Sequence, residues 1–276
     1  MGERKRHLKE LAADPRFITG IHNYCDRWCE HCPLTSRCLA YAMEQGEGVG
    51  DPAARDIRNQ AFWRHTEEIL RETKEMLEEL MEAHSIVLEP LDADAERALT
   101  AWHDEAQAHP HAQAGADYAG IVDAWFDQAE GCFATRGEAL ALQERMGLAS
   151  ADPAEDARRL QDAAEIIRWY QYQIPVKIVR AIGSAQRDKL LDLPHDPGDA
   201  DGSAKVALLG MDRSLVAWSE VLRQLPGEED RTLPLLASLS RLRRDVETAF
   251  PHARAFLRPG FDTGERTEAW TCDTDR

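Results

Sequence analysis

The apolar residues between Ile57 and Ala83 recur every three or four positions, which is the spacing of one helix face. They are Phe62, Ile69, Leu70, Met76, Leu77, Leu80 and Met81. Charged side chains fill most of the remaining positions, so the many glutamates of this stretch are predicted to form a solvated face and not a substrate site. Helical spacing returns along most of the chain, and no segment alternates apolar and polar residues as a strand does. The sequence therefore predicts an all-α protein.

Five further helices are expected, over about 92–110, 118–146, 152–182, 203–225 and 233–250. Asp152 can cap the helix that Pro153 begins. Gly131 is a possible interruption, and Pro175 is expected to kink its helix because proline lacks a backbone donor. These segments predict a helical bundle of about six or seven helices with an N-terminal four-cysteine metal-binding loop.

The expected organisation is a cysteine-rich metal-binding segment over residues 1–50 and a helical bundle over 51–276, packed together as one domain. A chain of 276 residues can bury a large core, so it does not need a metal merely to fold. Its apolar runs are too short to cross a membrane. No apolar signal segment follows the basic N-terminus, so a cytoplasmic location is expected.

Acidic residues outnumber basic ones by 50 to 33, which gives a formal charge of −17. Such a field repels phosphate backbones, so indiscriminate nucleic-acid binding is disfavoured. Arg241, Arg243 and Arg244 could form a local basic face, although a solvated helix face is the simpler interpretation.

Four cysteines lie close together at the front of the chain, in the segment CDRWCEHCPLTSRC. Cys25, Cys29, Cys32 and Cys38 can converge on one centre because the loop that carries them is short. Soft sulfur ligands select zinc or an iron-sulfur cluster. Zinc sites usually consist of two separated ligand pairs, whereas cluster ligands often lie in one compact loop, as here. The spacing therefore favours a [4Fe-4S] cluster, with zinc as the alternative.

The stretch from Cys29 to Ala42 resembles two iron-sulfur loops. Its gaps of two and five residues between Cys29, Cys32 and Cys38 are those of the endonuclease III and adenine glycosylase family, which often has proline after the same cysteine as Pro33 here. WhiB-like regulators share these gaps, and the residues Leu39, Ala40, Tyr41 and Ala42 are similar to theirs as well. The resemblance implies a [4Fe-4S] role for these three cysteines. Three residues separate Cys25 from Cys29, a gap that neither family has.

Two other metal chemistries fit less well. Cys25, Cys29 and Cys32 alone have the spacing of radical SAM enzymes, but those resemble a βα barrel and this chain lacks the strands. Ferritin-like di-metal sites need Glu-x-x-His on two helices, and the sequence contains no such pair.

Some residues near the loop and on the 160–180 helix could assist chemistry. His22 and His31 flank the loop and could tune a cluster or relay a proton, although surface positions are the simpler interpretation. Tyr24 and Trp28 are expected to shield the cluster from water. A polar pocket could form from Glu165, Arg168, Tyr170 and Gln171, which share neighbouring helical turns, although an internal ion pair is the simpler alternative. Cys132 and Cys272 are isolated in the sequence. They are interpreted as an ordinary small hydrophobic residue and an exposed thiol of the tail.

Three functions remain open from the sequence. The first is an iron-sulfur protein for electron transfer or redox sensing, acting with a protein redox partner or a small molecule that the residues do not identify. The second is a zinc or cluster staple that orders the N-terminal segment of a helical interaction protein. The third is a cluster-containing enzyme whose pocket lies on the 160–180 helix.

Overall fold

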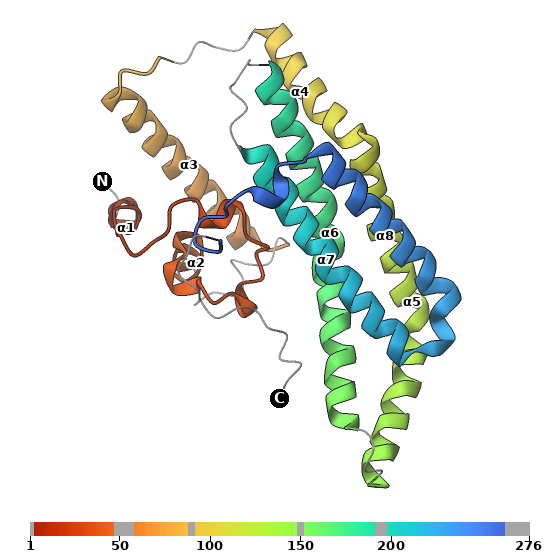
Figure 1. Cartoon of the computed structure of the whole chain (residues 1–276). Coiled ribbons are helices and arrows are strands. Elements are labelled where there is room, and N and C mark those ends of the chain that lie inside the picture. Colours follow the sequence, from red (N-terminus) through yellow and green to blue (C-terminus); the bar gives the residue numbers. More distant parts are fainter. Residues whose placement is uncertain (1–2, 47–57, 88–91, 148–151, 191–197, 263–276) are drawn as a thin grey trace. The chain divides into compact units, whose positions relative to one another are not determined.

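The computed structural model describes residues 3–46, 58–87, 92–147, 152–190 and 198–262, and within these ranges it contains helices and no strand (Figure 1). The prediction of an all-α protein with a helical bundle is confirmed. The α-helices of the described residues are α1 (Glu3–Ala12), α2 (Leu39–Gly46), α3 (Gln60–Ala83), α4 (Ala93–Ala108), α5 (Pro110–Arg145), α6 (Pro153–Leu190), α7 (Asp199–Gln224) and α8 (Glu229–Ala249).

The chain's internal contacts divide it into two compact units. One unit consists of the residues up to Glu96 together with the segment that starts at Arg258, and the other is Arg97–Leu257. The sequence suggested a division at residue 50 instead. Because the chain returns to the first unit after α8, residues 258–262 belong with the cysteine loop. We call the first the cysteine unit and the second the bundle unit.

Four helices of the bundle unit close into a ring. Helix α5 packs on α6, α6 on α7, α7 on α8, and α8 again on α5, and Figure 1 shows the four side by side. Helix α4 joins them through Trp102, whose indole N–H donates to the carbonyl of Gly183 on α6 at 2.9 Å. The core of the bundle unit thus lies between α5, α6, α7 and α8.

Aromatic side chains fill the middle of this core. Trp218 is fully buried and its indole N–H donates to the hydroxyl of Tyr118 at 3.0 Å. Trp125 meets Trp218 edge to face, with ring centroids 4.8 Å apart. Burial raises the pKa of Tyr118 to about 12, so its hydroxyl stays neutral and the polar pair is satisfied without a buried charge.

The start of α6 follows the local sequence signal. Asp152 accepts a hydrogen bond from the backbone N–H of Glu155 at 3.1 Å, and Pro153 is the first helical residue. This is the capping arrangement that the sequence predicted. The helix then continues through Pro175 to Leu190 without a break.

Helix α5 is longer than expected. It begins at Pro110, where the ring nitrogen of His109 accepts from the N–H of His111 at 3.2 Å, and not near Tyr118. Gly131 does not interrupt it, because it lies inside one continuous helix.

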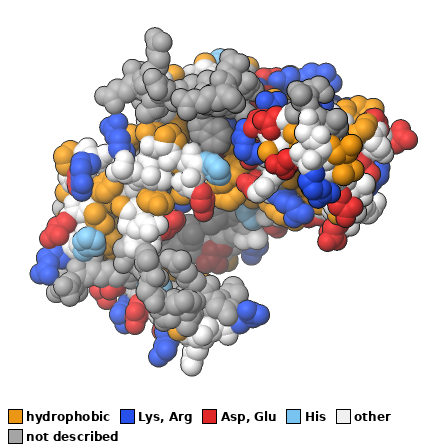
Figure 2. Space-filling model, turned by 90° about the horizontal axis from the view of Figure 1, so that it is seen from below, with side chains coloured by type: hydrophobic (Ala, Val, Ile, Leu, Met, Phe, Trp, Pro, Cys, Tyr) orange, Lys and Arg blue, Asp and Glu red, His pale blue; other side chains and the backbone are white. Residues whose placement is uncertain are grey.

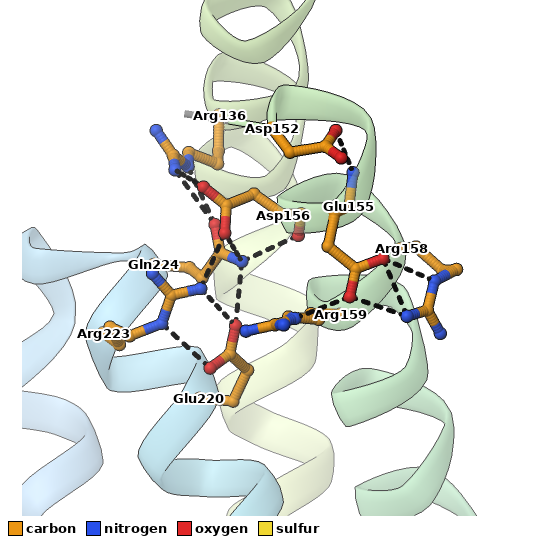
Figure 3. Close-up of polar contacts among 9 residues, drawn as sticks. All are labelled: Arg136, Asp152, Glu155, Asp156, Arg158, Arg159, Glu220, Arg223 and Gln224. Carbon is orange, nitrogen blue, oxygen red and sulfur yellow. Dashed lines mark hydrogen bonds and ion pairs between the residues drawn. The ribbon is translucent and has the colours of Figure 1, made fainter. Parts of the chain in front are cut away.

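A polar network joins α5, α6 and α7 near the first turn of α6 (Figure 3). Gln224 is 2% exposed; its amide accepts from Arg136 at 3.0 Å and donates to the carbonyl of Asp156 at 2.7 Å and to Glu220 at 2.9 Å. Arg223 bridges Glu220 at 2.6 Å and Asp156 at 2.8 Å. Since both Asp156 and Glu220 have arginine partners, the network ties the ends of these helices together.

Surface charge is mixed on the face that Figure 2 shows, where acidic and basic side chains are interspersed. The suggested basic face on α8 is partly neutralised, because Asp212 pairs with Arg243 at 3.1 Å and with Arg254 at 2.5 Å. Within the described ranges, no helix combines the length and apolarity needed to cross a bilayer.

The contact between α6 and α7 yields a stability prediction. A Cβ on Gly210 would lie 2.8 Å from Cδ1 of Tyr170 and 3.3 Å from Cγ1 of Ile174, so Gly210→Ala should lower the free energy of unfolding by about 1–3 kcal/mol. A Cβ on Gly137 meets nothing within 4 Å, so the control Gly137→Ala should raise this free energy by up to about 1 kcal/mol. Urea unfolding followed by circular dichroism measures both. Equal stability of Gly210→Ala and the unchanged protein would contradict this tight contact.

Candidate metal centre

Short helical turns place the four cysteines along one cavity. A 3-10 turn over Cys29–His31 ends with the N–H of Cys32 donating to the carbonyl of Cys29 at 3.2 Å. A second turn over Thr35–Arg37 ends with the N–H of Cys38 donating to the carbonyl of Thr35 at 3.2 Å. Each turn therefore reverses the chain directly before a cysteine.

The remaining interval, between Cys25 and Cys29, contains a backbone reversal of another kind. Arg27 has a φ of 58°, in the left-handed region that few side chains adopt. The thiol of Cys25 donates to the carbonyl of His22 at 3.5 Å. These local features fold residues 25–38 into a closed loop, which α2 continues immediately after Cys38.

All four cysteines line one small cavity. Its volume is about 20 Å³, which is about the room that one water molecule needs. The side chains are half-buried and none of the four is in a disulfide. The cavity is lined by Ile21, His22, Cys25, Asp26, Arg27, Trp28, Cys29, Cys32, Thr35, Cys38, Tyr41 and Phe261.

The walls of this cavity are largely apolar. Ile21 is 2% exposed and Trp28 is 9% exposed. The ring of His31 meets Trp28 edge to face, with centroids 4.4 Å apart, so His31 supports the wall from outside. Trp28 thus takes the shielding position expected of it, whereas Tyr24 is not among the lining residues.

Two lining aromatics were not expected from the sequence. Tyr41 stands one helical turn after Cys38 on α2, so helical spacing could have identified it. Phe261 comes from the far end of the chain, and no local pattern marks it. His22 lines the cavity as well, close enough to be a neighbour of any bound group.

Burial makes the thiolate form costly in this cavity. It raises the pKa of Cys29 to about 11, and the negative charge of Glu44 adds to the effect. Burial also raises the pKa of Cys32, with a smaller contribution from Asp26. Thiolates so placed need a nearby positive charge. A soft metal centre would supply it, so the donor set and its surroundings fit a thiolate-bound metal.

The thiols share the cavity without forming a coordination sphere. Among the described residues, no group of three or more His, Cys, Asp or Glu side chains is arranged to hold a metal ion.

The four residues considered for a pocket on α6 turn to different neighbours. Glu165 accepts from Gln161 on the same helix at 3.0 Å, and Arg168 lies over the ring of Phe126, 4.2 Å from its centroid. In addition, Tyr170 contacts Arg213 on α7, while Gln171 donates to Asp123 on α5 at 2.9 Å. These contacts direct the four side chains to four different neighbours and do not bring them together.

Of the two isolated cysteines, Cys132 does not line this cavity. Cys132 donates to Glu228 at 3.1 Å, and this hydrogen bond raises the pKa of its thiol. Cys272 lies outside the described residues.

Comparison of the chain with protein-family models, with curated proteins and with solved structures finds no match.

The cavity predicts which cysteines a metal needs. Replacing Cys29, Cys32 or Cys38 by Ser should abolish metal binding, because a hydroxyl is a much poorer ligand than a thiolate for a soft metal. Cys132→Ser is the matched control and should retain the full metal content, measured by inductively coupled plasma mass spectrometry on anaerobically purified protein. Loss of metal in Cys132→Ser, or retention in Cys32→Ser, would require a different set of ligands.

Proposed function

We propose that Cys25, Cys29, Cys32 and Cys38 hold a [4Fe-4S] cluster, and that the protein uses it for electron transfer or redox sensing. The observation that carries the proposal is the cavity itself: four half-buried thiols from one loop line a single space with apolar walls. Four soft donors on one space are the ligand set of such clusters.

The loop favours a cluster over a zinc ion. Its four cysteines lie within residues 25–38 and lack the two separate pairs that are common in structural zinc sites. The resemblance of Cys29–Cys38 to iron-sulfur loops points the same way. The four cysteines are free thiols, which persist in reducing compartments. We therefore include a cytoplasmic location in the proposal.

A [4Fe-4S] cluster takes up and releases one electron at a potential set by charge, hydrogen bonds and solvent exposure. In this chain, Trp28 and Ile21 keep water from the thiols. The carboxylate of Glu44 places negative charge near Cys29, which disfavours the addition of an electron and so lowers the reduction potential. These residues would tune the site towards the oxidised cluster.

A structural staple is the second candidate. Between α1 and α2 the chain has only short 3-10 turns, and in this stretch the buried hydrophobic residues are Ile21, Trp28 and Leu34. A segment with so small a core gains much of its order from a bound metal.

Metal content separates iron-sulfur from zinc. Protein purified without oxygen should be brown, absorb visible light in the cluster band and contain about four irons per chain, as the ligand set implies. Visible spectroscopy and metal analysis of the same sample test this. Colourless protein with one zinc per chain would defeat the cluster proposal and favour the staple.

Removing the metal distinguishes two roles of the site: a redox module, and a structural metal that holds the whole fold together. The core around Trp125 and Trp218 lies in the bundle unit, and the four cysteines lie in the cysteine unit. Chelation of the reduced protein should therefore leave most of the helical circular dichroism signal and remove order around residues 20–45 first. A global loss of helix on chelation would contradict the redox-module interpretation.

A further inference from the structure

A short segment from the end of the chain completes the wall of the cysteine cavity. All lining residues lie between Ile21 and Tyr41 except Phe261. Phe261 belongs to the segment Arg258–Asp262, which follows the bundle unit and is part of the cysteine unit. We call this segment the C-terminal cap.

The cap is a well-formed turn. The N–H groups of Phe261 and Asp262 donate to the carbonyl of Arg258 at 3.2 and 3.1 Å. The carboxylate of Asp262 accepts from the backbone N–H of Arg258 at 3.0 Å and from its Nε at 3.1 Å. The guanidinium of Arg258 lies 4.8 Å from the centroid of the Phe261 ring. These contacts fix the ring that lines the cavity.

Gly260 seats the cap tightly against the loop. Its φ is +77°, and a Cβ at this position would lie 2.8 Å from Cδ1 of Ile18 and 3.1 Å from Cδ1 of Ile21. Both the backbone conformation and the space therefore demand glycine. Ile21 and Leu34 are buried beside it, so the cap closes a dry surface and does not merely touch the loop.

We propose that the C-terminal cap controls access of water and oxidants to the four-cysteine site, with Phe261 as the shielding side chain. This inference rests on the proposed function for its consequence, the lifetime of the cluster in air. The apolar shell of a metal site governs how easily solvent reaches it, and Phe261 contributes a large aromatic surface to that shell. Opening of the cap would further expose the thiols, which are half-buried with the cap in place.

The first test uses the metal-free full-length chain, so that it does not depend on which metal binds. Iodoacetamide forms an S–C bond with a thiol and releases iodide, and peptide mass spectrometry reports its rate at each cysteine. Phe261→Ala should raise the labelling rate of Cys25, Cys29, Cys32 and Cys38 about tenfold, because the rate follows the population of the locally open state. Phe261→Leu should restore most of the protection, and Cys132 should label at an unchanged rate in every variant.

A matched pair of glycine variants tests the seat of the cap without removing Phe261. Gly260→Ala should expose the four cysteines as Phe261→Ala does, since the added methyl meets Ile18 and Ile21. Gly227→Ala should not, because a Cβ there meets nothing within 4 Å. Circular dichroism of each variant verifies that the bundle has folded.

The second test exposes the anaerobically purified, metal-bound protein to air and follows its visible absorbance. Faster bleaching in Phe261→Ala and Gly260→Ala than in Gly227→Ala supports the proposal. Unchanged thiol labelling in Phe261→Ala overturns it, whichever metal is bound. If the protein binds zinc and its thiols become reactive only in Phe261→Ala, the cap proposal stands and the cluster proposal is rejected. The two proposals can therefore fail independently of each other.

Discussion

The close approach of α6 and α7 is the contact on which the bundle unit depends. Gly210 lets α7 come so near α6 that a single added carbon would meet the ring of Tyr170. The hydroxyl of the same tyrosine contacts Arg213 one turn later on α7. Trp218 then occupies the space between α7 and α5, where it meets Tyr118 and Trp125. Dense interdigitation of this kind makes a core intolerant of added volume and gives it a single arrangement.

The cysteine unit is ordered by different means. Around residues 13–38 it has no α-helix, and few of its apolar side chains are fully buried. In its loop, two 3-10 turns are each followed directly by a cysteine, Cys32 and Cys38. In the C-terminal cap, Gly260 packs against Ile18 and Ile21. Because these interactions are local and weak, the proposed metal would contribute most to order in this part of the chain, whereas the bundle unit has a sufficient core of its own.

Features of this structure that depend on residues close together in the sequence could be predicted, and features that depend on distant residues could not. The all-α class and the start of α6 at Asp152 were predictable, since helical spacing and capping act within a few residues. The cysteine quartet is equally local. The early start of α5 was not predicted, because Gly115 weakens the helical signal while its lack of a side chain lets α5 approach Pro175, where a Cβ would lie 3.2 Å from that residue's Cα. Neither the position of Phe261 at the cavity nor the partner of Gln171 could be predicted from the sequence. Helical spacing shows which face of a helix a residue occupies, but not which distant segment packs against that face.

Electrostatics connects the cavity with its proposed use. The four thiols are half-buried in an acidic chain. Burial and the nearby carboxylates of Glu44 and Asp26 make thiolates unfavourable, as the raised pKa values of Cys29 and Cys32 indicate. Metal binding must therefore release protons from the site, and the affinity should fall as the pH decreases. The same negative surroundings would disfavour an added electron on a bound cluster. Phe261 lines the same cavity, so the residues that close the site would also limit how far solvent weakens the effect of these charges.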